Sequence, residues 1–116
     1  MASTDHSLKS KVALVTGGAR RIGAAIARTL HAQDMNIVIH YRHSAGDAQS
    51  LSDALNAERP GSVELVKGNL ENTQDCSRLA QQAIEVFGRI DALINNASAF
   101  FPTPVGEVTQ AHWETL

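Results

Sequence analysis

Two kinds of apolar pattern alternate along this chain, one of short continuous runs and one of residues spaced three or four positions apart. Four short runs rich in Val, Ile, Leu and Ala, and free of Pro, are typical of buried strands in a parallel sheet. They cover 12–15, Asn36–Tyr41, Val63–Lys67 and Ala92–Asn95. Between these runs the apolar residues recur every three or four positions, which indicates helices over 22–33, Ala45–Glu58 and 72–87. Gly88 is expected to end the third helix, and Thr109 to cap a fourth.

Each predicted helix has an apolar face that is expected to pack on the sheet. The faces consist of Ile22, Ile26 and Leu30 in the first helix, of Ala48, Leu51 and Leu55 in the second, and of Cys76, Leu79, Ala80, Ala83, Ile84 and Phe87 in the third. Strands that alternate with helices predict a parallel sheet with right-handed crossovers, and the expected strand order is 3-2-1-4. In a doubly wound sheet the fourth strand is interior, yet no later strand is predicted to cover it. We therefore expect the front half of a doubly wound α/β domain over residues 11–116, with the second half missing, after a polar leader over residues 1–10.

Composition narrows the possible roles of the chain. Its 116 residues form one domain at most, and 43% hydrophobic with 19% charged residues is ordinary globular material. A formal charge of −2 favours neither nucleic acid nor an anionic membrane as a partner, and no apolar run is long enough to span a bilayer. The polar start lacks a signal-peptide core, and the single cysteine, Cys76, is interpreted as a buried residue in a reducing cytoplasm. The five histidines show no metal-ligand spacing and, apart from His43, are interpreted as surface or strand-end residues.

The stretch 16–23, which reads TGGARRIG, joins the first strand to the first helix. Glycines in such a turn let the backbone approach a pyrophosphate, which lies against the free N–H groups of the helix N-terminus. Arg20 and Arg21 add two cations where the helix end is already positive, which is favourable with an anion bound. The turn therefore predicts a dinucleotide site in a Rossmann-type sheet.

The end of the second strand indicates which dinucleotide is bound. An NAD site usually has a carboxylate about 20 residues after the glycines, to hold the ribose 2′-OH. Here Arg42 lies 19 residues after Gly23, His43 and Ser44 follow it, and the first acid is Asp47. A cation and a hydroxyl suit a 2′-phosphate, so NADPH is the predicted cofactor, and the alternative is a solvated loop end with incidental charge.

Three segments together resemble the short-chain dehydrogenase/reductase family: 16–23, Asn69-Leu70 and 91–97 (DALINNA). Within that family, Arg21, the stretch 40–44 (HYRHS) and the stretch 96–104 (NASAFFPTP) resemble the pteridine reductases. The family usually has glycine at the positions of Arg21 and Ser98, and aspartate at the position of Asn69. An asparagine amide can still pair with an adenine edge, because it offers both a donor and an acceptor.

The resemblance implies an NADPH-dependent reductase, a homotetramer when complete, that passes hydride to a dihydropterin or dihydrofolate-type ring. The cofactor residues it implies are Gly17, Arg20, Arg21, Ile22, Gly23, Tyr41, Arg42, His43, Ser44, Asn69, Leu70, Asn96, Ala97 and Ser98. The pterin residues it implies are Arg21, Ser98 and Phe100, the last as a stacking face; for Phe101 a structural role is equally compatible, and Asn95 is interpreted as structural.

The family's proton donor is a Tyr in a Tyr-x-x-x-Lys pair. The only tyrosine here is Tyr41, with Ala45 four positions later, so no catalytic residue is expected in this chain. Two alternatives stay open: a carbonyl or oxoacyl reductase of the same family, and a nucleotide-binding module without catalysis.

Overall fold

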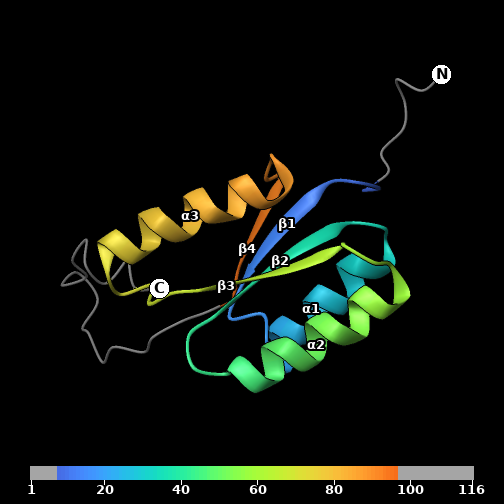
Figure 1. Cartoon of the computed structure of the whole chain (residues 1–116), viewed down its shortest axis with the longest axis horizontal. Coiled ribbons are helices and arrows are strands. Elements are labelled where there is room, and N and C mark those ends of the chain that lie inside the picture. Colours follow the sequence, from blue (N-terminus) through green and yellow to red (C-terminus); the bar gives the residue numbers. More distant parts are fainter. Residues whose placement is uncertain (1–7, 97–116) are drawn as a thin grey trace, which may run out of the picture.

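A computed structural model describes residues 8–96 as a parallel sheet with helices on both faces (Figure 1). The elements in chain order are β1 (Val12–Thr16), α1 (Arg21–Ala32), β2 (Asn36–Tyr41), α2 (Ala45–Glu58), β3 (Val63–Lys67), α3 (Thr73–Phe87) and β4 (Ala92–Asn95). The strand order is β3-β2-β1-β4, with all three pairings parallel. The predicted fold class and strand order are therefore confirmed, and the predicted helix beginning at Thr109 lies outside the described residues.

The sheet separates two apolar layers. In Figure 1, α1 and α2 lie on one side of the sheet and α3 on the other. Ile37 and Ile39 of β2 pack with the buried residues of α1 and α2, whereas Val38 between them packs with those of α3. Because both faces are covered, β1 and the middle of β2 are buried throughout, as the apolar runs predicted.

The predicted face of α1 was wrong by one position. Ile22 is 70% exposed, and the buried residues of the helix are Gly23, Ala27 and His31, with Ile26 and Leu30 only partly buried. The two sets are neighbouring stripes of one helix, and small residues at 23 and 27 let its axis come closer to the sheet than larger residues would. The stripe with the least bulk therefore faces the sheet, although it is less apolar.

The predicted face of α3 was too wide. Leu79 and Ala83 are buried, but Ala80 and Ile84 are exposed. Cys76, which was expected to be buried, is half-buried, and its thiol donates to the carbonyl of Leu70 at 3.1 Å. The reason is that α3 is the only described helix on its face of the sheet, so it has no neighbouring helix to cover its flanks.

β4 is the last strand at one side of the described sheet. In the described residues β4 pairs with β1 alone, and Leu93 of β4 is 62% exposed. Asp91, just before β4, accepts a 2.8 Å hydrogen bond from the Val12 amide and so fixes the start of β4 against β1.

None of the described helices has the length and hydropathy that a membrane span requires.

Candidate nucleotide-binding site

The carboxyl ends of the four strands meet at one edge of the sheet, where open α/β sheets bind ligands. The glycine turn after β1 is packed tightly against the start of α1. Gly17 has φ of +61°, which a side chain rarely permits. A Cβ atom at Gly23 would lie 2.2 Å from the Gly17 carbonyl oxygen. The first turn of α1 therefore lies directly on the turn backbone, which requires glycine at position 23.

Arg21, the first residue of α1, has φ of +51°, in the left-handed region that favours glycine. A non-glycine residue there costs about 1 kcal/mol or more, and such strain is concentrated at functional sites. No side chain caps this helix, and its first turn contains no acidic residue. The helix start thus combines a positive dipole end with an exposed arginine side chain, a favourable arrangement for an anion.

Arg20, also predicted to face the phosphates, reaches across to α2. Its Nε lies 3.3 Å from the Asp47 carboxylate, and both side chains are more than half exposed. Exposed ion pairs of this kind contribute little to stability. Arg20 therefore connects the glycine turn to the start of α2 through an ion pair that is exposed to solvent.

A hollow of about 390 Å³ lies where β2 and β3 end. It is lined by Arg42, His43, Lys67, Gly68, Asn69, Asp75 and Arg78. Three of these are cations, and the one carboxylate, Asp75, lies 3.5 Å from Arg78 and accepts the Asn69 amide at 3.0 Å. That amide and then Arg78 lower the pKa of Asp75. The hollow keeps an excess of positive charge, as a phosphate-bearing ligand requires.

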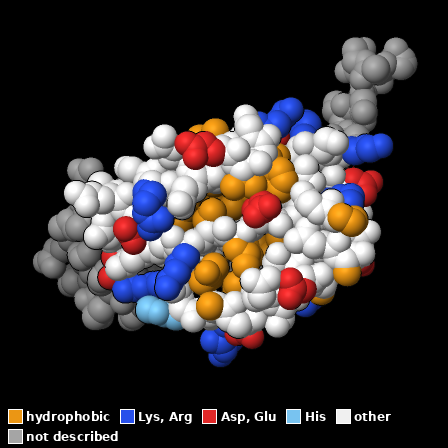
Figure 2. All heavy atoms as spheres, viewed as in Figure 1, with side chains coloured by type: hydrophobic (Ala, Val, Ile, Leu, Met, Phe, Trp, Pro, Cys, Tyr) orange, Lys and Arg blue, Asp and Glu red, His pale blue; other side chains and the backbone are white. Residues whose placement is uncertain are grey.

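Figure 2 shows Lys and Arg side chains gathered at the left of the molecule, the end where α3 begins, next to an exposed histidine side chain. Sequence reasoning anticipated Arg42, His43 and Asn69 here but missed Lys67 and Arg78. The available signal for Lys67 was strand register, because Lys67 pairs with Tyr41 at the ends of neighbouring parallel strands. Arg42 also lies 3.7 Å from Glu71, again as an exposed pair.

Other predicted cofactor residues hold local structure. The Asn69 side-chain oxygen accepts the Glu71 amide at 2.9 Å, and Leu70 packs against the core under α3. Tyr41 is half-buried against the other core, and Ser44 immediately precedes α2 without a side-chain capping bond. The fold brings these residues to the edge, with parts of their side chains engaged in it.

The end of β4 is joined to the glycine turn. The Asn96 side-chain amide donates to the Gly17 carbonyl at 3.1 Å, and its main-chain amide donates to the Thr16 hydroxyl at 3.0 Å. The Thr16 hydroxyl lies 3.1 Å from the side-chain oxygen of Asn95, which agrees with a structural role for Asn95. Asn96 therefore supports the turn from the side of β4. The predicted residues Ala97, Ser98 and Phe100 lie outside the described residues.

Two histidines interpreted as surface or strand-end residues are buried. His40 is 2% exposed and contacts the glycine turn, and His31 is 3% exposed in α1. Nothing in the local spacing marked either one, because a histidine is compatible with both strand and helix patterns.

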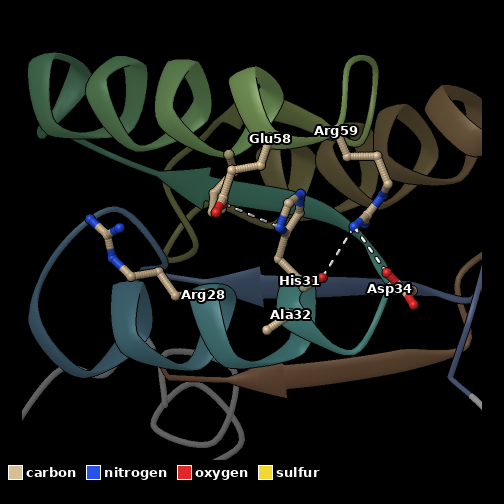
Figure 3. Close-up of a pocket in the computed structure, with 7 residues that line it drawn as sticks. Arg28, His31, Ala32, Asp34, Glu58 and Arg59 are labelled. Carbon is tan, nitrogen blue, oxygen red and sulfur yellow. Dashed lines mark hydrogen bonds and ion pairs between the residues drawn. The ribbon is translucent and has the colours of Figure 1, made fainter.

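A second hollow, of about 430 Å³, lies at the other end of the strands, where α1 and α2 end and lead into β2 and β3 (Figure 3). It lies between the ends of α1 and α2, with Arg28, His31, Asp34, Glu58 and Arg59 around it. The Arg59 guanidinium donates to the carbonyls of His31, at 3.2 Å, and of Met35, and it pairs with Asp34 at 3.6 Å. These bonds connect the residue after α2 to the last turn of α1 and to the residue before β2, so this cluster holds the fold together.

The strand order, the glycine turn and the basic edge define this chain as an α/β domain of the Rossmann class. A family model for short chain dehydrogenases matches residues 11–116. The chain belongs to that family.

Individual relatives share part of their length with this chain. It is 40% identical to "Pteridine reductase 1" of Leishmania tarentolae over 111 residues, covering 81% of this chain and 38% of the relative. It is 32% identical to an uncharacterized oxidoreductase of Methylorubrum extorquens, over 94% of this chain and 44% of the relative. It is 33% identical to a hydroxynaphthalene reductase-like protein of Metarhizium anisopliae, over 97% and 42% of the two chains. The chain therefore spans about two fifths of the length of these relatives.

Proposed function

We propose that this chain is the cofactor-binding part of an NADPH-dependent pteridine reductase. The observation that carries the cofactor choice is the hollow at the ends of β2 and β3, where Arg42, His43 and Lys67 line one surface. A 2′-phosphate brings two negative charges to that surface, and no acid follows β2 before Asp47. NADH has no 2′-phosphate, so it would leave Arg42 only its exposed pair with Glu71.

The bound NADPH supplies a hydride from its nicotinamide ring, and the residues of this chain bind and orient it. The glycine turn and the start of α1 would hold the pyrophosphate, and Arg21 is proposed, from the resemblance to pteridine reductases, to contact both pyrophosphate and substrate. Ser98 and Phe100 are proposed to contact the pterin, the latter by ring stacking. The proton donor of the whole protein is proposed to lie outside these 116 residues, since Tyr41 has no lysine four positions later.

The pterin assignment is supported by Arg21, which occupies a left-handed position at the mouth of the site, and by the 40% identity to a pteridine reductase. A second candidate, an NADPH-dependent carbonyl reductase of the same family, is favoured by the similarity to a hydroxynaphthalene reductase-like protein. Steady-state rates with a dihydropterin and with a hydroxynaphthalene-type ketone separate the two. Turnover of the ketone without turnover of the pterin would refute the pterin proposal.

The cofactor proposal is tested in the full-length protein with the double variant Arg42→Ala/His43→Ala. A charge-assisted contact to phosphate contributes roughly 1.5–3 kcal/mol, so NADPH affinity is expected to fall by about tenfold or more while NADH affinity changes little. Arg28→Ala, which removes an arginine beside the opposite hollow, is the matched control and should leave both affinities unchanged. Equal losses for NADPH and NADH in the double variant would contradict the assignment.

A further inference from the structure

His40 contacts both parts of the candidate site, which are the glycine turn and the hollow at the ends of β2 and β3. It lies in β2, and its ring reaches both the glycine turn and the end of β3. The Gly17 amide donates to Nδ1 at 2.9 Å, and Nε2 lies 2.9 Å from the Gly68 carbonyl oxygen. The His40 main-chain carbonyl also accepts the Gly18 amide at 3.0 Å. Two consecutive amides of the turn therefore bond to one residue.

These partners determine the protonation state of the ring. A main-chain N–H can only donate, so Nδ1 must be unprotonated, and the ring proton lies on Nε2 and is donated to Gly68. Burial lowers the pKa of His40, and the bond to the Gly68 carbonyl opposes that effect. His40 is thus a neutral imidazole whose acceptor and donor are both used.

The two bonded segments hold different ends of a dinucleotide under the function proposed above. Gly17 and Gly18 belong to the turn that leads to the start of α1, where the pyrophosphate is expected. Gly68 lines the basic hollow together with Arg42 and Asn69, where the 2′-phosphate and adenine are expected. We propose that His40 is a positioning residue for the dinucleotide, which holds the pyrophosphate turn and the adenosine hollow in one fixed relation through Gly17 and Gly68. This inference rests on the proposed function, but only on its dinucleotide part and not on the pterin.

Two substitutions separate the bonds of the ring. In His40→Asn the side-chain oxygen takes a place comparable to Nδ1 and can accept from Gly17, while the contact to Gly68 is lost. In His40→Gln the amide nitrogen takes a place comparable to Nε2 and can donate to Gly68, while the Gly17 amide is left without this acceptor. A buried N–H without an acceptor is the costlier defect, so the two variants should differ in cofactor affinity.

The measurement is NADP+ and NAD+ affinity of the full-length protein, with thermal melting of each variant. His40→Gln should weaken both cofactors by about tenfold, because the pyrophosphate is common to both, whereas His40→Asn should retain most of the affinity. His31→Asn, which alters a buried histidine at the opposite edge, should change melting without changing cofactor affinity. Equal losses in the two His40 variants, or a greater loss in His40→Asn, would overturn the role of His40.

A pH series provides a readout that does not depend on the stability of His40→Gln. Protonation of Nδ1 removes the acceptor for Gly17, so wild-type affinity for NAD+ should fall on the acid side. The titratable and charged groups around the hollow are the same in His40→Asn; they are Arg42, His43, Lys67, Asp75 and Arg78. That variant should therefore show a smaller acid loss than the wild type, and identical profiles would refute the proposal. A wild-type protein that binds neither cofactor would instead refute the proposed function itself.

Discussion

The contact between Gly23 and the glycine turn makes a strong prediction about one added methyl group. In Gly23→Ala the new Cβ would lie 2.2 Å from the Gly17 carbonyl oxygen, 2.9 Å from the Gly17 carbonyl carbon and 2.7 Å from the Asn96 side-chain nitrogen. Two of these three atoms belong to the backbone, so a rotamer change cannot remove the clash. The start of α1 and the glycine turn must therefore move apart.

The magnitude follows from comparing this position with another helical glycine. Inserting a methyl group into a closely packed site costs about 1–3 kcal/mol when the backbone has to shift. Gly46, in the first turn of α2, has nothing within 4 Å of the corresponding Cβ position. There the same substitution should raise the free energy of unfolding by up to about 1 kcal/mol, because alanine restricts the unfolded chain more than glycine does. The matched pair is therefore expected to shift stability in opposite directions.

Urea unfolding of the full-length protein and of both variants measures these free energies, and NADPH titration measures the site. Gly23→Ala should lose stability and also lose NADPH affinity, because Gly17 and Asn96 are displaced together. Gly46→Ala should keep wild-type affinity. If Gly23→Ala were as stable as the wild type and bound NADPH equally well, the close approach of α1 to the turn would be refuted.

Two further predictions concern Arg21 and His31. Arg21→Gly should leave the free energy of unfolding unchanged or raise it by up to about 1 kcal/mol, because it relieves a left-handed φ of +51°. The same variant should weaken NADPH and pterin binding, and a clear loss of stability would contradict the strain argument. The pKa of His31 is lowered by burial and then by Arg59, against the opposing charges of Glu58 and Asp34, so folding favours the neutral ring. The free energy of unfolding should therefore fall as pH drops below the ordinary histidine pKa of 6.5. Urea midpoints at pH 7.5 and 5.5 measure this fall, which should be smaller in His31→Gln than in the wild type. An equal fall in both proteins would exclude His31 as a source of the pH dependence.

The periodicity of the chain determined which elements form and in what order. The bounds of β2, α2, β3 and β4 agree with those predicted, because each has a clear apolar period and a local stop, such as Pro60-Gly61 after α2 or Gly88 after α3. The strand order also followed, since right-handed crossovers and a glycine turn after β1 leave few topologies. The sequence also predicted which residues meet at the carboxyl ends of the strands, because parallel strands end together. These residues are Arg42, His43 and Asn69.

Only the tertiary structure decided how each element is rotated and which distant side chains meet. Periodicity defines a stripe on a helix, but the close approach allowed by Gly23 and Ala27 turned that stripe by one residue and left Ile22 exposed. Arg78 reached the hollow from α3, on the other side of the strand ends, a placement that no local pattern encodes. His40 became a link between Gly17 and Gly68 because two loops separated along the chain close over the same strand end. Local spacing is a property of neighbouring residues, whereas these contacts depend on distances between segments that exist only after the sheet has assembled.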